Sequence, residues 1–483
     1  MPNQGTSFTS LSEVEKLLKE AEGKSFRELD ETNRGKSLGN KGSLGQIIEE
    51  SVLHYGINSD PEADISVGNT RYEIKVTPVH FVGRKNRRRL VSKERLVMDI
   101  INYLKLPREV FDTSTFWKKA KNLIVIYYAD TRTDKRKESR ADCKVIKSFI
   151  FQYLKDDLST IKQDWNKIHQ EVSEGHADLL SEADTNYLAA CTKGQTAASS
   201  IREAPGPQGQ GRIRAKQRAF SFKQSYMTSK VHQLLGDLPE VSRLDQPKEQ
   251  PLEEFIKNTI GRVAGSTVAD LASRYNLDIH STAKDFNSKL AFRILGTDRN
   301  SVSQVEQFTA ANVSTIKSVV TYSRGFPMEH MSFPVIKESE WNDIAGTSPW
   351  EESSFYNFFA NNRFLIVVFH SDGINRRAVG KEYDTLQGGF LWNMPKQDID
   401  NYVKPVWLQL RTLLNSPEGL GYHSHNLLPG TEFNQVFHIR PHARNGQDCV
   451  TLPNGERITK QAFWLDRRYL GRVIQKNLGP KNA

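Results

Sequence analysis

The segment Asp64-Ile-Ser-Val-Gly-Asn-Thr-Arg-Tyr-Glu73-Ile-Lys75 decides the fold of the first half of this 483-residue chain. Gly68-Asn69 separates two β-prone runs, which is the signal of a two-residue hairpin turn. The cross-strand neighbours that this turn predicts are Val67 with Thr70, Ser66 with Arg71, Ile65 with Tyr72 and Asp64 with Glu73. Because side chains alternate along a strand, Glu73 and Lys75 share one face of the hairpin with Asp64.

This face has the chemistry of a metal-dependent nuclease. Two opposed carboxylates repel each other and destabilise a hairpin unless a cation lies between them. Asp64 and Glu73, with open positions for water and phosphate oxygens, suit Mg²⁺, and more than one ion could be held. Such an ion lowers the pKa of an attacking water, and Lys75 can orient that water or offset negative charge. The alternative for so short a motif is a solvated hairpin face.

The residues around the hairpin strengthen the nuclease interpretation. A helix predicted over about 42–55 carries Glu49 after the apolar residues Ile47 and Ile48, where a third carboxylate can reach the same ion. The run 84–89 (Arg-Lys-Asn-Arg-Arg-Arg) follows the hairpin, and its Arg87 and Arg88 are expected to contact DNA phosphates. Lys119 precedes the apolar run Leu123–Tyr128 and is expected to project into the same cleft.

The periodicity of the first half predicts a mixed α/β domain. Strands are expected at Ile65–Val67, Tyr72–Val79 and Leu123–Tyr128. The segment Leu90–Leu106 has helical periodicity and ends before Pro107, so a helix is expected there.

Composition and charge favour a polyanionic partner. The net charge is +10 with a pI near 9.2, and the mean hydropathy of -0.57 argues against membrane residence. The N-terminus lacks an apolar secretory segment. Three scattered cysteines, Cys143, Cys191 and Cys449, form neither a disulfide framework nor a zinc motif. A cytoplasmic protein is therefore expected.

The length predicts two domains with a linker. We place an N-terminal catalytic domain at 1–235, a linker at 236–250 and a C-terminal domain at 251–483, and we expect a second loop at Ala204–Gly211. The chain also repeats itself loosely at a shift of about 242 residues. The matched segments are Leu123–Asp130 with Leu365–Asp372, Ile74-Lys75 with Ile316-Lys317, and Lys216-Gln217 with Lys460-Gln461.

The repeat predicts a second copy of the fold without an intact active site. At this shift Glu73 falls on Thr315 and Lys119 on Asn361, whereas Glu306 and Lys317 fall on Asp64 and Lys75. A site without its central carboxylate should not hold Mg²⁺ well. The C-terminal domain is therefore expected to bind DNA without cutting it.

Ordered motifs resemble those of the MutH-type PD-(D/E)xK endonucleases. They are Gly42-Ser-Leu-Gly45-Gln-Ile-Ile-Glu49, Asp64, Tyr72-Glu73-Ile-Lys75 and Asp112-Thr-Ser-Thr-Phe-Trp-Lys-Lys119. Ser92–Tyr103, Ala190–Gly194 and Lys216–Lys223 are more similar still to the two-domain type II restriction endonucleases of that family, which cut GATC sites. The resemblance spans almost the whole chain and implies a restriction-endonuclease-like mixed sheet flanked by helices in each half.

The resemblance assigns roles to particular residues. It implies that Asp64 and Glu73 are metal ligands, Lys75 the catalytic lysine, Glu49 an auxiliary acid and Lys119 a second active-site lysine. Lys193 matches a base-reading lysine, and Lys216 and Arg218 belong to a second recognition segment. Two departures, Cys191-Thr192 in place of Arg-Pro and Ser221 in place of a tyrosine, mean that the base contacts are not carried over whole.

Arg440-Pro441-His442 resembles the same recognition segment in the second half, so Arg440 and His442 are expected to contact a second DNA site. We therefore expect a Mg²⁺-dependent type II restriction endonuclease, cutting double-stranded DNA at GATC. It is expected to be monomeric in solution and able to dimerise on DNA, with a cognate methyltransferase in the host. The alternatives are a strand-nicking mismatch-repair endonuclease and a non-catalytic DNA-binding protein on a vestigial nuclease fold.

Overall fold

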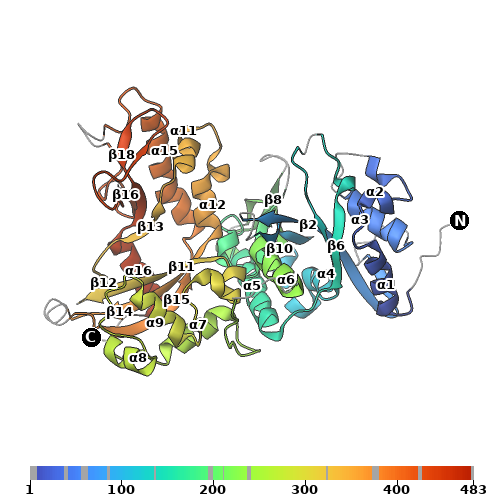
Figure 1. The fold of residues 1–483 in the computed structure, drawn as a ribbon, viewed down its shortest axis with the longest axis horizontal. Coiled ribbons are helices and arrows are strands. Elements are labelled where there is room, and N and C mark those ends of the chain that lie inside the picture. Colours follow the sequence, from blue (N-terminus) through green and yellow to red (C-terminus); the bar gives the residue numbers. More distant parts are fainter. Residues whose placement is uncertain are drawn as a thin grey trace. The chain divides into compact units, whose positions relative to one another are not determined.

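The chain forms two compact units. The computed structural model describes residues 8–36, 42–55, 64–83, 88–134, 137–193, 200–209, 211–235, 241–322, 325–372, 380–421 and 427–479. Unit 1 comprises Met1–Leu180 and Thr185–Glu240, and unit 2 comprises Ser181–Asp184 and Val241–Ala483 (Figure 1). No helix in the described ranges is long and apolar enough to cross a membrane.

Part of the predicted linker belongs to unit 2. Ser242 donates its N–H to the Gln304 carbonyl at 2.9 Å, and Leu244 donates to Gln307 Oε1 at 2.9 Å. These bonds hold the segment that follows residue 241 against the helix at Glu306–Ala310. Residues 236–240 of the predicted linker lie outside the described part of the chain.

Unit 1 is built on a mixed sheet with the order β1-β2-β5-β6, and β3 pairs with the far part of β2. The strands are β1 (Ile65–Val67), β2 (Thr70–Val82), β3 (Arg89–Ser92), β5 (Leu123–Ala129) and β6 (Lys144–Ile150). β2 runs parallel to β5, and the other pairs are antiparallel. The predicted mixed α/β fold is therefore confirmed.

A second sheet of unit 1 has the order β4-β10-β7. Its strands are β4 (Leu96–Ile100), β10 (Arg218–Phe222) and β7 (Leu188–Thr192). The helix predicted over Leu90–Leu106 is therefore wrong, because β3 and β4 occupy this segment. The buried residues of β4 are Leu96 and Met98, two apart, and their strand pairs with β10 far along the chain. That long-range pairing overrides the local helical spacing.

Helices cover both faces of the main sheet. α1 (Leu11–Ala21), α2 (Phe26–Leu29) and α3 (Ser43–Ile47) pack on the face that carries Ile74 and Ile124. An aromatic core fills the other side, where Phe116 of α4 (Thr115–Ala120) lies 5.1 Å from Phe220 between ring centres. α5 (Lys155–Ser173) and α6 (Gln224–Leu235) complete this core.

In its described residues, unit 2 repeats these strand pairings except that of β1 with β2. Its sheets have the orders β12-β11-β14-β15 and β13-β19-β16, with β11 parallel to β14 and β14 antiparallel to β15. The strands are β11 (Val313–Tyr322), β12 (Phe326–Pro327), β13 (Met331–Val335), β14 (Arg363–His370), β15 (Thr385–Trp392), β16 (Phe437–Pro441) and β19 (Gln461–Leu465). The helices are α7 (Leu252–Gly261), α8 (Val268–Arg274), α9 (Phe286–Ile294), α10 (Glu306–Ala310), α11 (Glu338–Ala345), α12 (Ser354–Asn361), α14 (Lys396–Asp398), α15 (Lys404–Leu414) and α16 (Arg467–Leu478).

The structural repeat differs from the sequence match by one residue on the central strand. Ile74 pairs with Ile124, whereas Ile316 pairs with Leu365, so Leu365 corresponds to Ile124 and not to Leu123. A strand that is apolar on both faces looks the same after a slip of one residue, and sequence alone cannot place it. Ser371, whose N–H donates to Thr321 at 2.8 Å, is thus the counterpart of Asp130.

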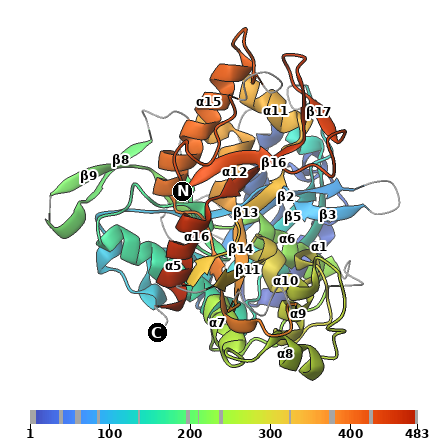
Figure 2. The same ribbon diagram turned by 90° about the vertical axis from the view of Figure 1, so that its left-hand side faces the viewer.

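Each unit also carries a two-stranded hairpin. β8 (Ile201–Pro205) and β9 (Arg212–Lys216) form one in unit 1, and Figure 2 shows it projecting from its unit. Of the predicted loop Ala204–Gly211, Ala204 and Pro205 belong to β8, and the Gly206 N–H donates to the Gly211 carbonyl across the turn. In unit 2 the hairpin is β17 (Cys449–Thr451) with β18 (Arg457–Thr459). The ladder forms because residues 201–205 and 212–216 flank the Pro/Gly-rich turn with strand-compatible sequence.

Candidate active site and nucleic-acid interface

The predicted hairpin forms with the predicted register. Val67 faces Thr70, and Ile65 faces Tyr72. The ladder stops there, because the carboxylate of Asp64 turns to accept the N–H of Ile74 at 2.7 Å. Asp64 is thereby held beside the strand that carries Glu73, which is buried at 5% exposure, and Glu73 forms an ion pair with Lys75.

Glu49 joins this group from a π-helical turn, Ile48–Val52, that continues α3. The Leu53 N–H donates to the Ile48 carbonyl at 2.9 Å and closes the wide turn. Such turns are frequent at functional sites because they redirect side chains that a regular helix would space evenly. Burial and then the Asp64 carboxylate raise the pKa of Glu49, against the opposing effect of Lys75, to about 7. These mutual effects place Glu49, Asp64 and Lys75 in one electrostatic cluster.

Lys119 reaches the edge of the same cluster from the last turn of α4. Its ammonium group donates to Asp99 Oδ1 at 3.0 Å, and its charge lowers the pKa of Glu73. Asp99, on β4, is a site residue that sequence reasoning missed. Asp99 lies inside Ser92–Tyr103, a segment that resembles the family, and this was the one signal in the sequence. Because a helix was expected there, the sequence did not predict the strand β4, on which Asp99 faces Lys119.

The cluster suits a divalent cation. Burial and the Asp64 charge raise the pKa of Glu73, while Lys75 and Lys119 lower it. The Asp64 charge raises the pKa of both Glu49 and Glu73, so the carboxylates repel when ionised, and a cation relieves that repulsion. An all-oxygen donor set from Glu49, Asp64 and Glu73 is the type that Mg²⁺ prefers.

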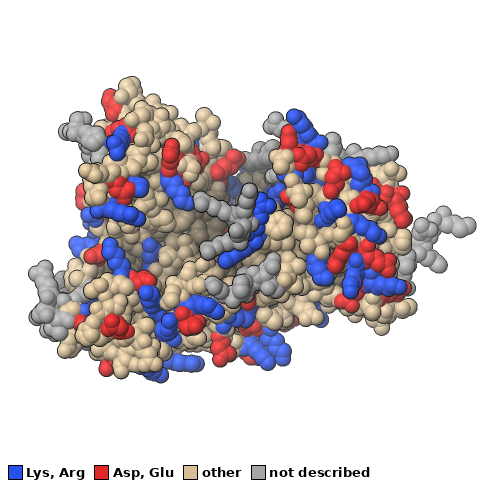
Figure 3. All heavy atoms as spheres, viewed as in Figure 1, with Lys and Arg blue, Asp and Glu red and all other residues tan. Residues whose placement is uncertain are grey.

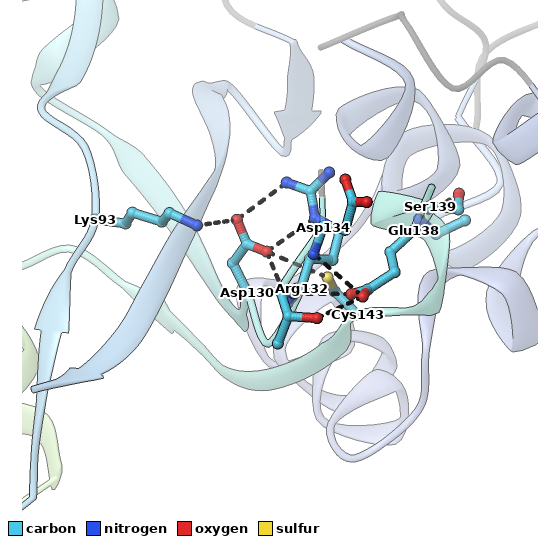
Figure 4. Close-up of polar contacts among 9 residues, drawn as sticks. Lys93, Asp130, Arg132, Asp134, Glu138, Ser139 and Cys143 are labelled. Carbon is cyan, nitrogen blue, oxygen red and sulfur yellow. Dashed lines mark hydrogen bonds and ion pairs between the residues drawn. The ribbon is translucent and has the colours of Figure 1, made fainter. Parts of the chain in front are cut away.

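A second charged cluster, at the opposite end of β5, is satisfied internally. Figure 4 shows Asp130 between Lys93 and Arg132, whose Nε donates to Asp130 Oδ1 at 2.9 Å. Burial opposes ionisation of Asp130, but the two cations hold its pKa well below the usual range. This network ties the residue after β3 to the end of β5 and has the bonding of a structural ion cluster.

The predicted recognition residues of unit 1 have different environments. Lys193 is exposed just after β7, and its N–H donates to the Gln217 carbonyl at 2.9 Å. Lys216 is half-buried at the end of β9. Arg218 is only 3% exposed and donates to the Ala190 carbonyl at 2.6 Å, so its side chain joins β10 to β7 and offers little surface for the expected DNA contact. Arg88 is exposed, and Arg87 lies outside the described residues.

The described positions of unit 2 that match the site do not carry the acidic cluster. Lys317 is the counterpart of Lys75, but its ammonium group donates to the Ser332 carbonyl at 2.5 Å, and burial lowers its pKa to about 8. Thr315 stands where β2 has Glu73. Glu306, expected to match Asp64, instead begins helix α10 and forms an ion pair with Arg243. A helix thus precedes β11 where a hairpin precedes β2.

The match of Lys119 to Asn361 is also wrong. The two helices α4 and α12 begin at the N-cap serines Ser114 and Ser353. Counted from these caps, the counterpart of Lys119 is Phe358. The α12 helix is longer at its C-terminal end, and this length difference displaced the sequence match.

Arg440 and His442 lie at the end of β16, the strand of unit 2 that corresponds to β7, and Lys193 lies at the matching end of β7 in unit 1. The His442 N–H donates to the Lys460 carbonyl at 2.8 Å, which repeats the bond of Lys193. Both side chains are exposed and lie beside Trp464: the Arg440 guanidinium is 5.7 Å from one Trp464 ring centre, and the His442 ring centre is 5.4 Å away. Sequence reasoning assigned no role to Trp464, which supports both residues.

The positive charge of the chain is not spread evenly. In the view of Figure 3, acidic and basic side chains are interspersed over the part of unit 1 that holds α1–α3. On the β8–β9 hairpin, by contrast, Arg202, Arg212 and Arg214 are all exposed, with Glu203 as the exposed acid. A protruding hairpin with this composition can follow a phosphate backbone.

Comparisons with known proteins agree with this geometry. The family model for the DNA mismatch repair enzyme MutH matches residues 53–164, which include Asp64, Glu73, Lys75 and Lys119. The chain is also 30% identical to the type II restriction enzyme Sau3AI of Staphylococcus aureus over 518 residues. This similarity covers 97% of the chain and 99% of that enzyme, so it extends through both units.

Proposed function

Because the chain belongs to the MutH-like family of DNA endonucleases that includes type II restriction enzymes, we propose that it is a Mg²⁺-dependent type II restriction endonuclease that cuts double-stranded DNA at GATC. The observation that carries the proposal is the convergence of Glu49, Asp64 and Glu73 with Lys75. GATC is the site expected from the resemblance of the motifs.

In this proposal Asp64 and Glu73 hold the cation, with Glu49 as an auxiliary acid. The cation would lower the pKa of the attacking water and stabilise charge at the scissile phosphate. Lys75 orients the water and offsets negative charge as the phosphodiester bond breaks. Lys119, held by Asp99, adds a second positive charge at the edge of the site. Lys193 reads a base edge, and Lys216 and Arg88 contact the backbone.

We propose that unit 2 binds a second copy of the site without cutting it. Arg440 is suited to read guanine in the major groove, and His442 stands where unit 1 has Lys193. The chain would be a monomer in solution, able to dimerise on DNA, and would act in the cytoplasm. Its host would hold a cognate methyltransferase that protects the same sites.

The test is cleavage of unmethylated plasmid by the full-length protein in Mg²⁺, followed by sequencing of the ends. Double-strand ends at GATC, absent in EDTA and with Glu73→Gln, support the proposal. Thr315→Val, at the matching position of unit 2, should cut like the wild type and serves as the matched control.

The other outcomes identify the rival functions. Single-strand nicks alone would favour a repair-type endonuclease, a possibility raised by the match to the mismatch repair enzyme MutH. If the protein retards GATC-bearing DNA but does not cut it with Mg²⁺ or Mn²⁺, it is a binding protein on a vestigial nuclease fold. Ends at another sequence would refute the site but keep the enzyme class.

A further inference from the structure

A cluster of metal-ligand residues lies in unit 2, on residues that the proposed nuclease function does not use. His330 precedes β13, His438 lies on β16, and Asp466 is the N-cap of α16. One potential ligand atom from each lies within 4.8 Å of the others. Two atoms that bind one ion at about 2.1 Å are at most about 4.2 Å apart, so small side-chain movements would bring these atoms into range.

The buried imidazole of His438 is the strongest sign of a missing ligand. The residue is 1% exposed, and both its Nδ1 and Nε2 are buried without a hydrogen-bond partner. A buried imidazole normally satisfies at least one nitrogen, since an unpaired polar group in the interior is costly. The ring of His438 meets the ring of His330 edge-on, with 4.8 Å between their centres.

We propose that His330, His438 and Asp466 form a binding site for a divalent transition-metal ion such as Zn²⁺. Two imidazoles and one carboxylate match the preferences of Zn²⁺ and its neighbours, whereas the all-oxygen cluster of unit 1 suits Mg²⁺. Burial keeps the pKa of His438 at about 4, so its imidazole is in the neutral form that binds metals. The unit 1 positions that correspond to these three residues hold Arg95, Ala189 and Lys223, so the site belongs to unit 2 alone.

The metal would brace the candidate recognition segment. His438 stands two residues before Arg440 on β16, and Asp466 begins the helix that follows β19. An ion bound by all three residues would tie together the chain before β13, the strand β16 and the start of α16. The strand β16, from which Arg440 and His442 extend, would then be held in a fixed position.

The Arg468 side chain competes with the ion for Asp466, and this competition gives a test. Arg468 donates to both carboxylate oxygens of Asp466, at 3.0 and 3.2 Å. The main-chain N–H of Arg467 donates to His330 Nδ1 at 3.1 Å, so His330 would bind an ion through Nε2 or give up this bond. A carboxylate has lone pairs for both an arginine and a metal. Removing the Arg468 guanidinium should nevertheless tighten metal binding, because it removes a like charge.

The experiment measures binding of Zn²⁺ to chelator-treated full-length protein by calorimetry, in excess Mg²⁺ to occupy the all-oxygen site. Co²⁺ replaces Zn²⁺ in a parallel titration, because its visible absorption reports the coordination geometry of the bound ion. The variants are His438→Leu and His330→Leu, which remove one ligand each, and Arg468→Met. His280→Ala removes an exposed histidine of the same unit and is the control. Asp466 is left intact because it caps α16.

We expect one Zn²⁺ per chain, with the affinity lowered by more than about 100-fold in both ligand variants, since loss of even an outer-shell partner costs roughly 10–100-fold. His280→Ala should bind like the wild type, and Arg468→Met should bind more tightly. His438→Leu should also keep its thermal stability without metal, because an unpaired polar group is replaced by an apolar one. Wild-type affinity in His438→Leu, or no Zn²⁺ binding by the wild type in Mg²⁺, would overturn the proposal.

Discussion

Lys75 and Lys317 occupy the same position in two matching pairs of parallel strands, but their ammonium groups have different partners. Lys75 pairs with the Glu73 carboxylate, whereas Lys317 donates to the Ser332 main-chain carbonyl. The neighbouring positions explain the difference, because Thr315 replaces Glu73 and helix α10 replaces the hairpin that carries Asp64. The two units therefore keep one fold, and at the described matching positions the acidic group beside the lysine is found in unit 1 but not in unit 2.

The first prediction contrasts these two lysines. Lys75→Met should lower the cleavage rate by about 100-fold or more, because a positioned charge in the transition state is worth roughly 10²–10³ in rate. Lys317→Met should stay within about 3-fold of the wild type, because Lys317 has no part in the proposed chemistry and loses contacts only within unit 2, to the Ser332 carbonyl and the Phe333 ring. Single-turnover cleavage of a GATC duplex measures both, and equal losses in the two variants would contradict the assignment.

The second prediction concerns pH and Glu49. Its folded pKa of about 7 lies above the ordinary value of 4.5, so between these pH values the folded chain holds a proton that the unfolded chain has lost. The free energy of unfolding should therefore fall as pH rises through this window. Glu49→Gln should remove that fall and stabilise the metal-free protein at pH 8 by on the order of 1 kcal/mol, after allowance for solvent screening.

Urea unfolding in EDTA at pH 4.5 and pH 8 checks this prediction. The two proteins should differ least at pH 4.5, where Glu49 is largely protonated in the folded chain. Added Mg²⁺ should reduce the difference in unfolding free energy between Glu49→Gln and the wild type at pH 8, because the cation binds the ionised Glu49 carboxylate of the wild type. A variant that is less stable than the wild type at pH 8 in EDTA would show that Glu49 is not destabilised by its neighbours.

The third prediction concerns the β8–β9 hairpin. Arg212→Ala with Arg214→Ala should weaken binding to GATC and non-GATC duplexes by similar factors, because exposed arginines on a projecting hairpin contact phosphates rather than bases. The salt dependence of log K should become shallower by about two counterions. Fluorescence anisotropy across a salt series in EDTA measures this, and a loss confined to GATC duplexes would instead indicate base reading by the hairpin.

The fourth prediction separates the two recognition segments. Arg440→Ala should weaken binding of the second duplex by roughly 10–100-fold, since a bidentate base contact contributes about 1–3 kcal/mol. At DNA concentrations that saturate the wild type with two duplexes per chain, this variant should bind one. Lys193→Ala should instead abolish site-selective cleavage, and Lys248→Ala, an exposed lysine of unit 2, is the charge control. A wild-type stoichiometry in Arg440→Ala would contradict the assignment.

The sequence by itself determined the local geometry of the candidate site. A two-residue turn at Gly68-Asn69 leaves one register for the hairpin, which pairs Ile65 with Tyr72. The face that Glu73 and Lys75 share follows from strand alternation, whereas the place of Asp64 depends on its hydrogen bond with the Ile74 N–H. The loss of the central carboxylate at Thr315 could be predicted for the same reason, because Lys317 lies two residues further along the same strand.

Only the tertiary structure decided which distant residues meet. The strands at Leu90–Leu106 form because β4 pairs with β10, and this pairing brings Asp99 to Lys119. The register of β14, one residue from the sequence match, and the burial of Arg218 likewise depend on neighbouring strands. A local pattern specifies periodicity and turn type, but the choice between two registers or between a surface and a core arginine is made by the free energy of packing against segments far along the chain.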